Sequence, residues 1–132
     1  MRSRIAQIFR YVYFAASWAF LAGLVYQVYT AGQAAVSHTA GWGDHAGFGF
    51  LILIASLLQL LAILPARLPR PAWWVSLGLF AAVLVQVVLA ANRPSPISAL
   101  HPVLALFAFS LSLWLALASL RAVRRAPARA DG

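Results

Sequence analysis

The sequence predicts an all-α membrane protein, folded as a bundle of four transmembrane helices. Two features of composition and one of pattern lead to this prediction. Hydrophobic residues make up 64% of the 132-residue chain, charged residues make up 9%, and the apolar residues fall in four long runs. Globular domains contain roughly 45–50% apolar and about 25% charged residues. A soluble fold could not bury so much apolar surface.

Each apolar run is long enough to cross the bilayer, because a helix rising 1.5 Å per residue needs about 20 residues to span it. The expected helices cover residues 11–30, 45–64, 72–91 and 101–120. The segments between them, which carry helix-ending Gly, Pro and polar residues, are 32–44, 65–71 and 92–100. Residues 1–125 should therefore form one transmembrane domain, followed by a cytoplasmic tail at residues 126–132.

The arginines predict the orientation of the four helices. Nine lie before the first helix, between the second and third, or after the fourth, whereas Arg93 alone lies on the other side. Arginines near the ends of transmembrane helices are retained in the cytoplasm. We therefore expect a multi-pass protein of the bacterial inner membrane, with both termini cytoplasmic. The run at 11–30 is longer than the apolar part of a signal peptide, which favours a retained helix.

Aromatic residues near the helix ends are expected to form belts at the two membrane surfaces. On the cytoplasmic side these residues are Tyr11, Tyr13, Trp73 and Trp74, and on the outer side they are Tyr26, Tyr29 and Trp42.

Composition also excludes several classes of function. All ten basic residues are arginines at chain ends or in connections, so nucleic acid is not an expected partner. The chain has no cysteine, and its only acids are Asp44 and Asp131, which excludes disulfides, thiolate metal sites and paired-carboxylate chemistry. No serine has a base beside it in the sequence pattern. The chain is expected to be non-catalytic by itself, with a place as a subunit of an oxidoreductase left open.

The two halves of the sequence resemble each other. Residues 25–32 (VYQVYTAG) align with residues 84–91 (LVQVVLAA), which matches Gln27 with Gln86. Allowing for a different loop length, His45 at the start of the second helix matches His101 at the start of the fourth. Two hairpins that enter the membrane from the same side would form a parallel repeat about an axis along the membrane normal. Chance similarity between apolar segments is the alternative.

The matched histidines are the candidate ligands. Asp44 is expected to cap the second helix, and Pro102 suits the first turn of the fourth, so both histidines should lie at similar depth. In a sequentially wound bundle these helices are diagonal, with axes roughly 12–14 Å apart. That separation suits a flat macrocycle held between His45 and His101, and histidine is an established axial ligand of haem iron. The alternative is that each histidine is only a polar cap at the membrane surface.

Small residues below each histidine would leave room for a ring. They share its helix face and include Gly49 in the second helix and Ala105 in the fourth. Arg93 and His38 would meet the haem propionates, and Gln27 and Gln86 would donate to a histidine or a head group. These features also have structural interpretations: close helix packing for the small residues, interhelical hydrogen bonds for the glutamines and an interface anchor for Arg93.

Three segments carry a resemblance to known proteins: residues 27–32, residues 45–49 (HAGFG) and residues 100–103 (LHPV). With these segments the chain resembles an uncharacterised bacterial family of small four-helix membrane proteins. More loosely, it is similar to four-helix b-type membrane cytochromes, in which histidines on facing helices hold haem. Two-haem members carry histidine pairs near both leaflets, whereas this sequence has none in its inner half. The resemblance therefore implies one haem b, near the outer face.

The leading hypothesis is a membrane haem-b-binding protein or cytochrome subunit, with His45 and His101 as iron ligands, that transfers electrons to a quinone or a periplasmic redox protein. The alternative is a structural or accessory subunit without its own cofactor, docked in a larger membrane complex or paired as a homodimer. A small-molecule carrier or quinone pocket between the repeats is a third reading. Membrane lipids surround the chain in every case.

Overall fold

The computed structural model of the chain describes residues 2–39, 41–92 and 95–124, with side chains from residue 4 onward. Its elements are α1 (Arg2–Gly32), a π-helical turn η1 (Gln33–Ser37), α2 (Trp42–Ala66), α3 (Arg70–Ala91), a 3-10 turn η2 (Pro96–Leu100) and α4 (His101–Arg124). No strand occurs in these ranges. The four α-helices are long and apolar enough to cross a membrane, which confirms the predicted all-helical class and fits a multi-pass membrane protein.

Helix α1 is longer than predicted at both ends. It begins at Arg2 because the polar first turns contain Arg, Ala and Gln, which are good helix formers. It also passes Gly32, since one glycine costs only about 1 kcal/mol and Gln33, Ala34 and Ala35 favour helix again. The helical path ends at His38, whose backbone is left-handed (φ 53°) and whose N–H donates to the carbonyl of Gln33. The first half of the predicted loop 32–44 is therefore helical.

Helix α2 also begins earlier than predicted, and the prediction of Asp44 as its N-cap is wrong. Gly41 takes the cap position in an extended conformation (φ −84°, ψ 161°), and the helix starts at Trp42. Asp44 lies in the first turn, where a carboxylate interacts favourably with the helix dipole. At its other end α2 continues through Pro65 and stops at Arg67, which is left-handed (φ 50°). The predicted break at 65–71 is therefore shorter than expected, because only residues 67–69 lie between α2 and α3.

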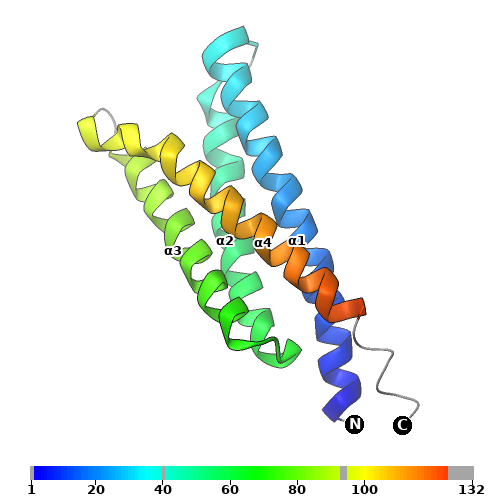
Figure 1. Ribbon diagram of the computed structural model, residues 1–132. Coiled ribbons are helices and arrows are strands. Elements are labelled where there is room, and N and C mark those ends of the chain that lie inside the picture. The colour runs from blue at the N-terminus through cyan, green and yellow to red at the C-terminus, as the bar shows by residue number, and fades with distance from the viewer. Residues whose placement is uncertain (1, 40, 93–94, 125–132) are drawn as a thin grey trace.

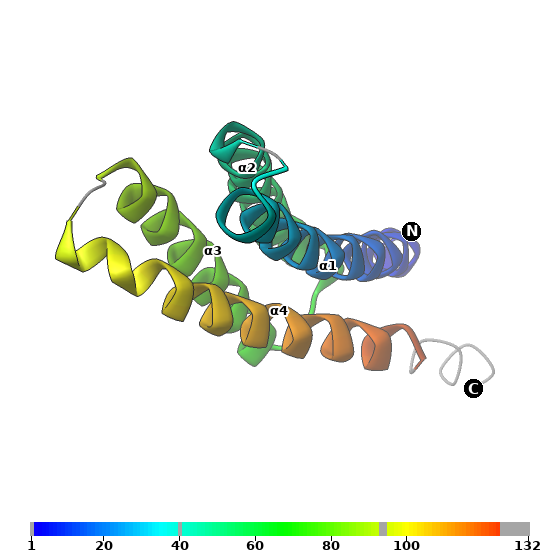
Figure 2. The ribbon, with the colours of Figure 1, turned by 90° about the horizontal axis from the view of Figure 1, so that it is seen from above.

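The helices wind sequentially, which is the condition under which the second and fourth helices were expected to be diagonal. Helix α1 packs against α2 and α4, and α3 packs against the same two helices, so α2 and α4 are diagonal. The start of α1 and the end of α4 lie at one end of the bundle, here called the terminal end (Figure 1). The opposite end, here called the histidine end, carries η1, η2 and the starts of α2 and α4. Toward the histidine end the hairpin of α1 and α2 leans away from the hairpin of α3 and α4 (Figures 1 and 2).

The buried positions repeat from one hairpin to the other. Most of those in α1 and α3 have equal spacing, and so do most of those in α2 and α4. The aligned pairs are Tyr13 with Ala72, Ser17 with Ser76, Phe20 with Leu79, Leu24 with Val83, Ile52 with Ala108, Ser56 with Ser112, Gln59 with Leu115 and Ile63 with Ser119. All sixteen residues are buried. This agreement favours a true internal repeat over chance similarity, since eight pairs keep the register that matches Gln27 with Gln86 and His45 with His101.

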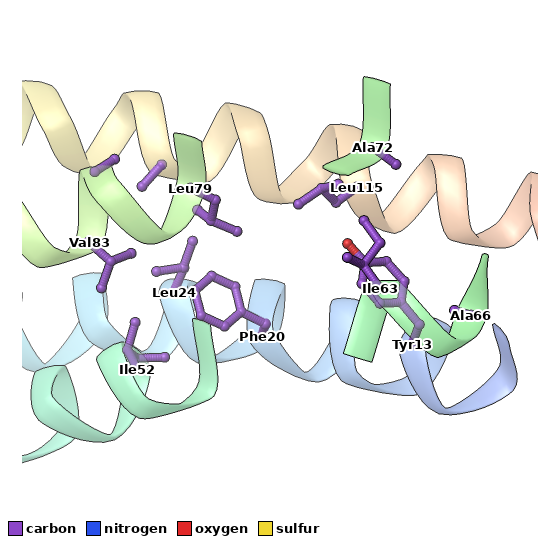
Figure 3. Packing of buried hydrophobic residues seen from close by; sticks show 12 residues of the cluster. Tyr13, Phe20, Leu24, Ile52, Ile63, Ala66, Ala72, Leu79, Val83 and Leu115 are labelled. Atoms are coloured by element: carbon purple, nitrogen blue, oxygen red, sulfur yellow. The ribbon is translucent and has the colours of Figure 1, made fainter. Parts of the chain in front are cut away.

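Between the bundle centre and the terminal end, the core contains a hydrogen-bonded polar network. The Tyr13 hydroxyl and Ser76 Oγ lie 2.7 Å apart and join α1 to α3. Gln59 Nε2 donates to Ser17 Oγ at 3.0 Å, and Ser17 Oγ donates to the Tyr13 carbonyl at 2.8 Å. Tyr13 is only 1% exposed, so its predicted place in an interface belt is wrong. It lies beside Ile63 and Leu115 within the bundle (Figure 3).

Candidate functional site: a histidine pair beside an apolar cavity

His45 and His101 come together at the histidine end. His45 is in the first turns of α2, His101 is the first residue of α4, and both are half-buried. Their ring centroids are 6.1 Å apart, with an interplanar angle of 67°. Because α2 and α4 are diagonal, the two imidazoles approach each other across the bundle.

Each imidazole is hydrogen-bonded to a main-chain carbonyl of the other helix in its own hairpin. His45 Nδ1 lies 3.0 Å from the Gln27 carbonyl oxygen, and His101 Nδ1 lies 3.1 Å from the Gln86 carbonyl oxygen. A carbonyl oxygen only accepts hydrogen bonds, so Nδ1 carries the proton in both rings. In the neutral ring, Nε2 then carries the lone pair that a metal requires. Both glutamines therefore hold the imidazoles through their main-chain carbonyls, and the predicted side-chain donation to a histidine is also present for Gln27, at the His45 carbonyl.

In the first hairpin, Thr30 and the Gln27 side chain form further hydrogen bonds around the histidine. Thr30, 2% exposed, donates from Oγ1 to the Gln27 carbonyl at 3.0 Å and lies 3.3 Å from His45 Nδ1. The Gln27 side chain donates from Nε2 to the His45 carbonyl at 2.7 Å. Leu89 takes the place of Thr30 in the aligned second hairpin, so an equivalent hydroxyl is lacking there.

A cavity of about 520 Å³ lies beside the two histidines. Its volume is in the range of about 300–1,000 Å³ that is typical of small-molecule and cofactor sites. Most of its wall comes from α2 and α3. The polar groups in the wall belong to the two histidines, the two glutamines and the indole N–H of Trp42. The full lining consists of Leu24, Gln27, Trp42, His45, Ala46, Gly49, Phe50, Ile52, Val83, Gln86, Val87, Ala90, Ala91 and His101.

The other predicted site residues are only partly brought together. Gly49 lines the cavity, and a Cβ there would meet Gln27 Nε2 at 2.8 Å, so glycine is required if Gln27 is to keep its bond to the His45 carbonyl. Ala105 is half-buried one turn below His101 but does not line the cavity. His38 is exposed and also lies outside the cavity wall. Arg93 lies outside the described residues.

Sequence reasoning missed two residues of the site. Trp42 lines the cavity, and its ring meets the edge of the His45 ring at a centroid distance of 5.7 Å. It precedes His45 by one helical turn, which puts both residues on one face. That spacing would have identified Trp42 had α2 been predicted to begin at Trp42. Thr30 was missed because a threonine near a helix end has no distinctive signal.

The chemistry of the residues present fits a haem better than a bare metal ion. Among residues 2–39, 41–92 and 95–124, no group of three or more His, Cys, Asp or Glu side chains could hold a metal. A bare ion such as zinc normally needs four ligands, whereas haem iron needs only its axial ligands from the protein. His45 and His101 are the two residues here that could supply such axial ligands, and their rings lie 6.1 Å apart.

Comparison with known proteins gives one match. No curated protein and no solved structure matches the chain. The profile of a family of unknown function, DUF6220, matches residues 27–92, which is half of the chain. The matched segment begins at Gln27 and contains His45, Gly49 and Gln86, whereas His101 lies beyond it. The predicted membership of an uncharacterised family is thereby confirmed: the chain belongs to the family of unknown function DUF6220.

Proposed function

We propose that the chain is a membrane-embedded haem-b-binding protein, a small b-type cytochrome or cytochrome subunit, with His45 and His101 as the axial ligands. The observation that supports this most is the pair of imidazoles 6.1 Å apart across the bundle, each with Nδ1 bonded to a main-chain carbonyl. The adjacent cavity provides apolar space of suitable size. When bound there, haem would supply one-electron transfer.

The chain's own residues would position and tune the site. A carbonyl that accepts from Nδ1 fixes the orientation and tautomer of an imidazole and raises the basicity of its Nε2. Gln27 and Gln86 would do this for His45 and His101, respectively. The apolar wall would exclude water, which influences the reduction potential of a buried metal centre. Among the other predicted haem contacts, Gly49 is supported by its position in the cavity wall. The pairing of Arg93 with a propionate is based on sequence alone.

The arginine distribution supports an orientation with both termini in the cytoplasm. The histidine end then lies at the outer face of a bacterial inner membrane. Only one histidine pair is present, so this subunit carries electrons within one leaflet and needs a partner to carry them across the membrane. The proposed protein is non-catalytic by itself and acts within, or beside, an oxidoreductase.

The test is an absorption spectrum of the purified protein, produced with ample haem supply, before and after reduction with dithionite. We expect the bands of a low-spin b-type haem in the wild type and their loss in His45→Ala and in His101→Ala. His38→Ala is the matched control, because His38 is exposed and outside the cavity, and it should keep the wild-type spectrum.

A folded wild type that binds no haem would contradict the proposal. In that case the accessory-subunit function becomes the better account, because the histidine bonds to the Gln27 and Gln86 carbonyls would then serve only to tie each hairpin together. Retention of the haem spectrum in both histidine variants would also contradict the assigned ligands.

A further inference from the structure

We infer that the redox partner of this site is a lipophilic quinol, which reaches it from the outer leaflet through the gap between α2 and α3. The inference rests on the proposed haem function and decides between the two electron partners considered above. It follows from where the cavity opens and which residues surround the opening.

The mouth of the cavity is bounded by α2 and α3 alone. Among the lining residues, those that are exposed are Trp42, Ala46, Phe50, Ala90 and Ala91. The lining residues from the other helices are covered: Leu24 is 8% exposed, and Gln27 and His101 are half-buried. From these lining residues the opening lies on the side of the bundle between α2 and α3. Their two hairpins lean apart toward this end (Figures 1 and 2).

The mouth extends into the depth expected for the hydrocarbon of the outer leaflet. Phe50 follows Trp42 by eight residues, a distance of about 12 Å along a helix that rises 1.5 Å per residue. Half the hydrocarbon core is about 15 Å thick. With Trp42 at the membrane surface, Phe50 lies well below it, and its side chain is 56% exposed toward lipid.

The described part of the lining suits an apolar partner. Among the described residues, no Asp, Glu, Lys or Arg lines the cavity. Water-soluble redox proteins associate through complementary charged surfaces, and the described lining offers none. A quinol with an isoprenoid tail has a flat apolar body and polar hydroxyls, and it is already dissolved in the lipid that the mouth faces. The small side chains of Ala46, Ala90 and Ala91 leave space for such a ring to approach.

The electrons balance with this partner. If each copy of the chain held one ferric haem, oxidation of one quinol to a quinone would break two O–H bonds, release two protons and pass one electron to each of two haem-loaded copies. The protons leave to the aqueous phase at the histidine end, which lies close to the mouth.

The test is stopped-flow reduction of the haem-loaded wild type in liposomes by two quinols with the same head group. One carries a decyl tail, and the other carries a sulfonate in its place. We expect the tailed quinol to reduce the site at least about tenfold faster, equivalent to about 1.4 kcal/mol in the encounter. Ala90→Trp and Ala46→Trp, on opposite sides of the mouth, should each remove this advantage when rates are expressed per bound haem.

Ala81→Trp is the matched control, because Ala81 is exposed and lies two and a half turns before Ala90, on the opposite face of α3. It should behave as the wild type with both quinols and with dithionite. Equal rates with both quinols, or unchanged rates in both mouth variants, would overturn the quinol route while leaving the haem function intact. A wild type without haem would overturn both.

Discussion

The two hairpins have the same histidine arrangement at the histidine end of the bundle. They differ between the bundle centre and the terminal end. At the histidine end each hairpin presents a histidine whose Nδ1 donates to the carbonyl of a glutamine on its first helix. Further toward the terminal end, the first hairpin carries Tyr13 and Gln59 where the second has Ala72 and Leu115. Under the proposed function, the histidine and the glutamine carbonyl present in both hairpins would hold a ligand between them. A feature present in one is explained by the packing of that hairpin.

The largest expected effect is a loss of haem affinity when a larger side chain is placed in the cavity wall of the first hairpin. The matched substitution in the second hairpin lies outside the cavity wall and should have little effect. Gly49 lines the cavity and its counterpart Ala105 does not. We expect Gly49→Leu to reduce haem affinity at least about a hundredfold, or about 2.7 kcal/mol, because the side chain displaces Gln27 and occupies the cavity. Ala105→Leu should retain most of the affinity. Haem titration measures both, and equal losses in the two variants would contradict the assigned cavity.

The next largest effect is expected from removing the hydrogen bond between Tyr13 and Ser76, which joins the two hairpins. Tyr13→Phe removes the hydrogen bond to Ser76 and leaves a buried serine hydroxyl to find another acceptor. We expect the free energy of unfolding to fall by about 1–2 kcal/mol, measured by SDS titration in bicelles. Tyr11→Phe is the control, since Tyr11 is 48% exposed, and should change it little. Unchanged stability in Tyr13→Phe would show that this bond does not hold the hairpins together.

A third substitution makes the first hairpin more like the second. Gln59→Leu loses the bond to Ser17, which is worth about 0.6 kcal/mol in a membrane bundle. It also removes Gln59 Oε1, which is buried and finds no hydrogen-bond partner among the described residues, at a cost of about 1–3 kcal/mol. We therefore expect Gln59→Leu to stabilise the bundle by about 1 kcal/mol with haem binding unchanged. Destabilisation by the same unfolding assay would indicate that this oxygen is satisfied.

The smallest effect concerns Thr30, which only the first hairpin has. Thr30→Val removes a hydroxyl that shares the Gln27 carbonyl with His45 Nδ1. One such bond is worth about 0.6 kcal/mol, so haem affinity should fall about threefold. Thr30→Ser keeps the hydroxyl and should preserve the affinity. If valine and serine give the same affinity, Thr30 has no part in holding His45.

Much of the fold could be predicted from the sequence because the bilayer imposes strong rules. Four long apolar runs predict four helices, and the aligned halves predict that His45 and His101 face each other. The helix ends were less predictable. Glycine at 32 and aspartate at 44 are typical of helix ends, but good helix formers after Gly32 and an extended Gly41 moved the actual ends.

The cavity wall was beyond sequence reasoning. An apolar side chain facing lipid looks the same as one facing a neighbouring helix, so Val83 and Leu24 carry no sign of their place in the wall. Tyr13 illustrates the same problem: a tyrosine near a helix end fits an interface belt, yet packing against α3 buries it beside Ser76. A small residue one turn below a histidine was expected to line the cofactor space. Gly49 does line the cavity, whereas Ala105 does not.

The most direct test of the central claim is low-temperature electron paramagnetic resonance of the oxidised, haem-loaded protein, which reports the iron's two axial ligands. We expect a low-spin ferric signal characteristic of two imidazoles, converted to a high-spin signal or lost when either His45 or His101 is replaced by alanine. A high-spin signal in the wild type, or no haem signal at all, would contradict the claim that these two histidines hold one haem between the hairpins.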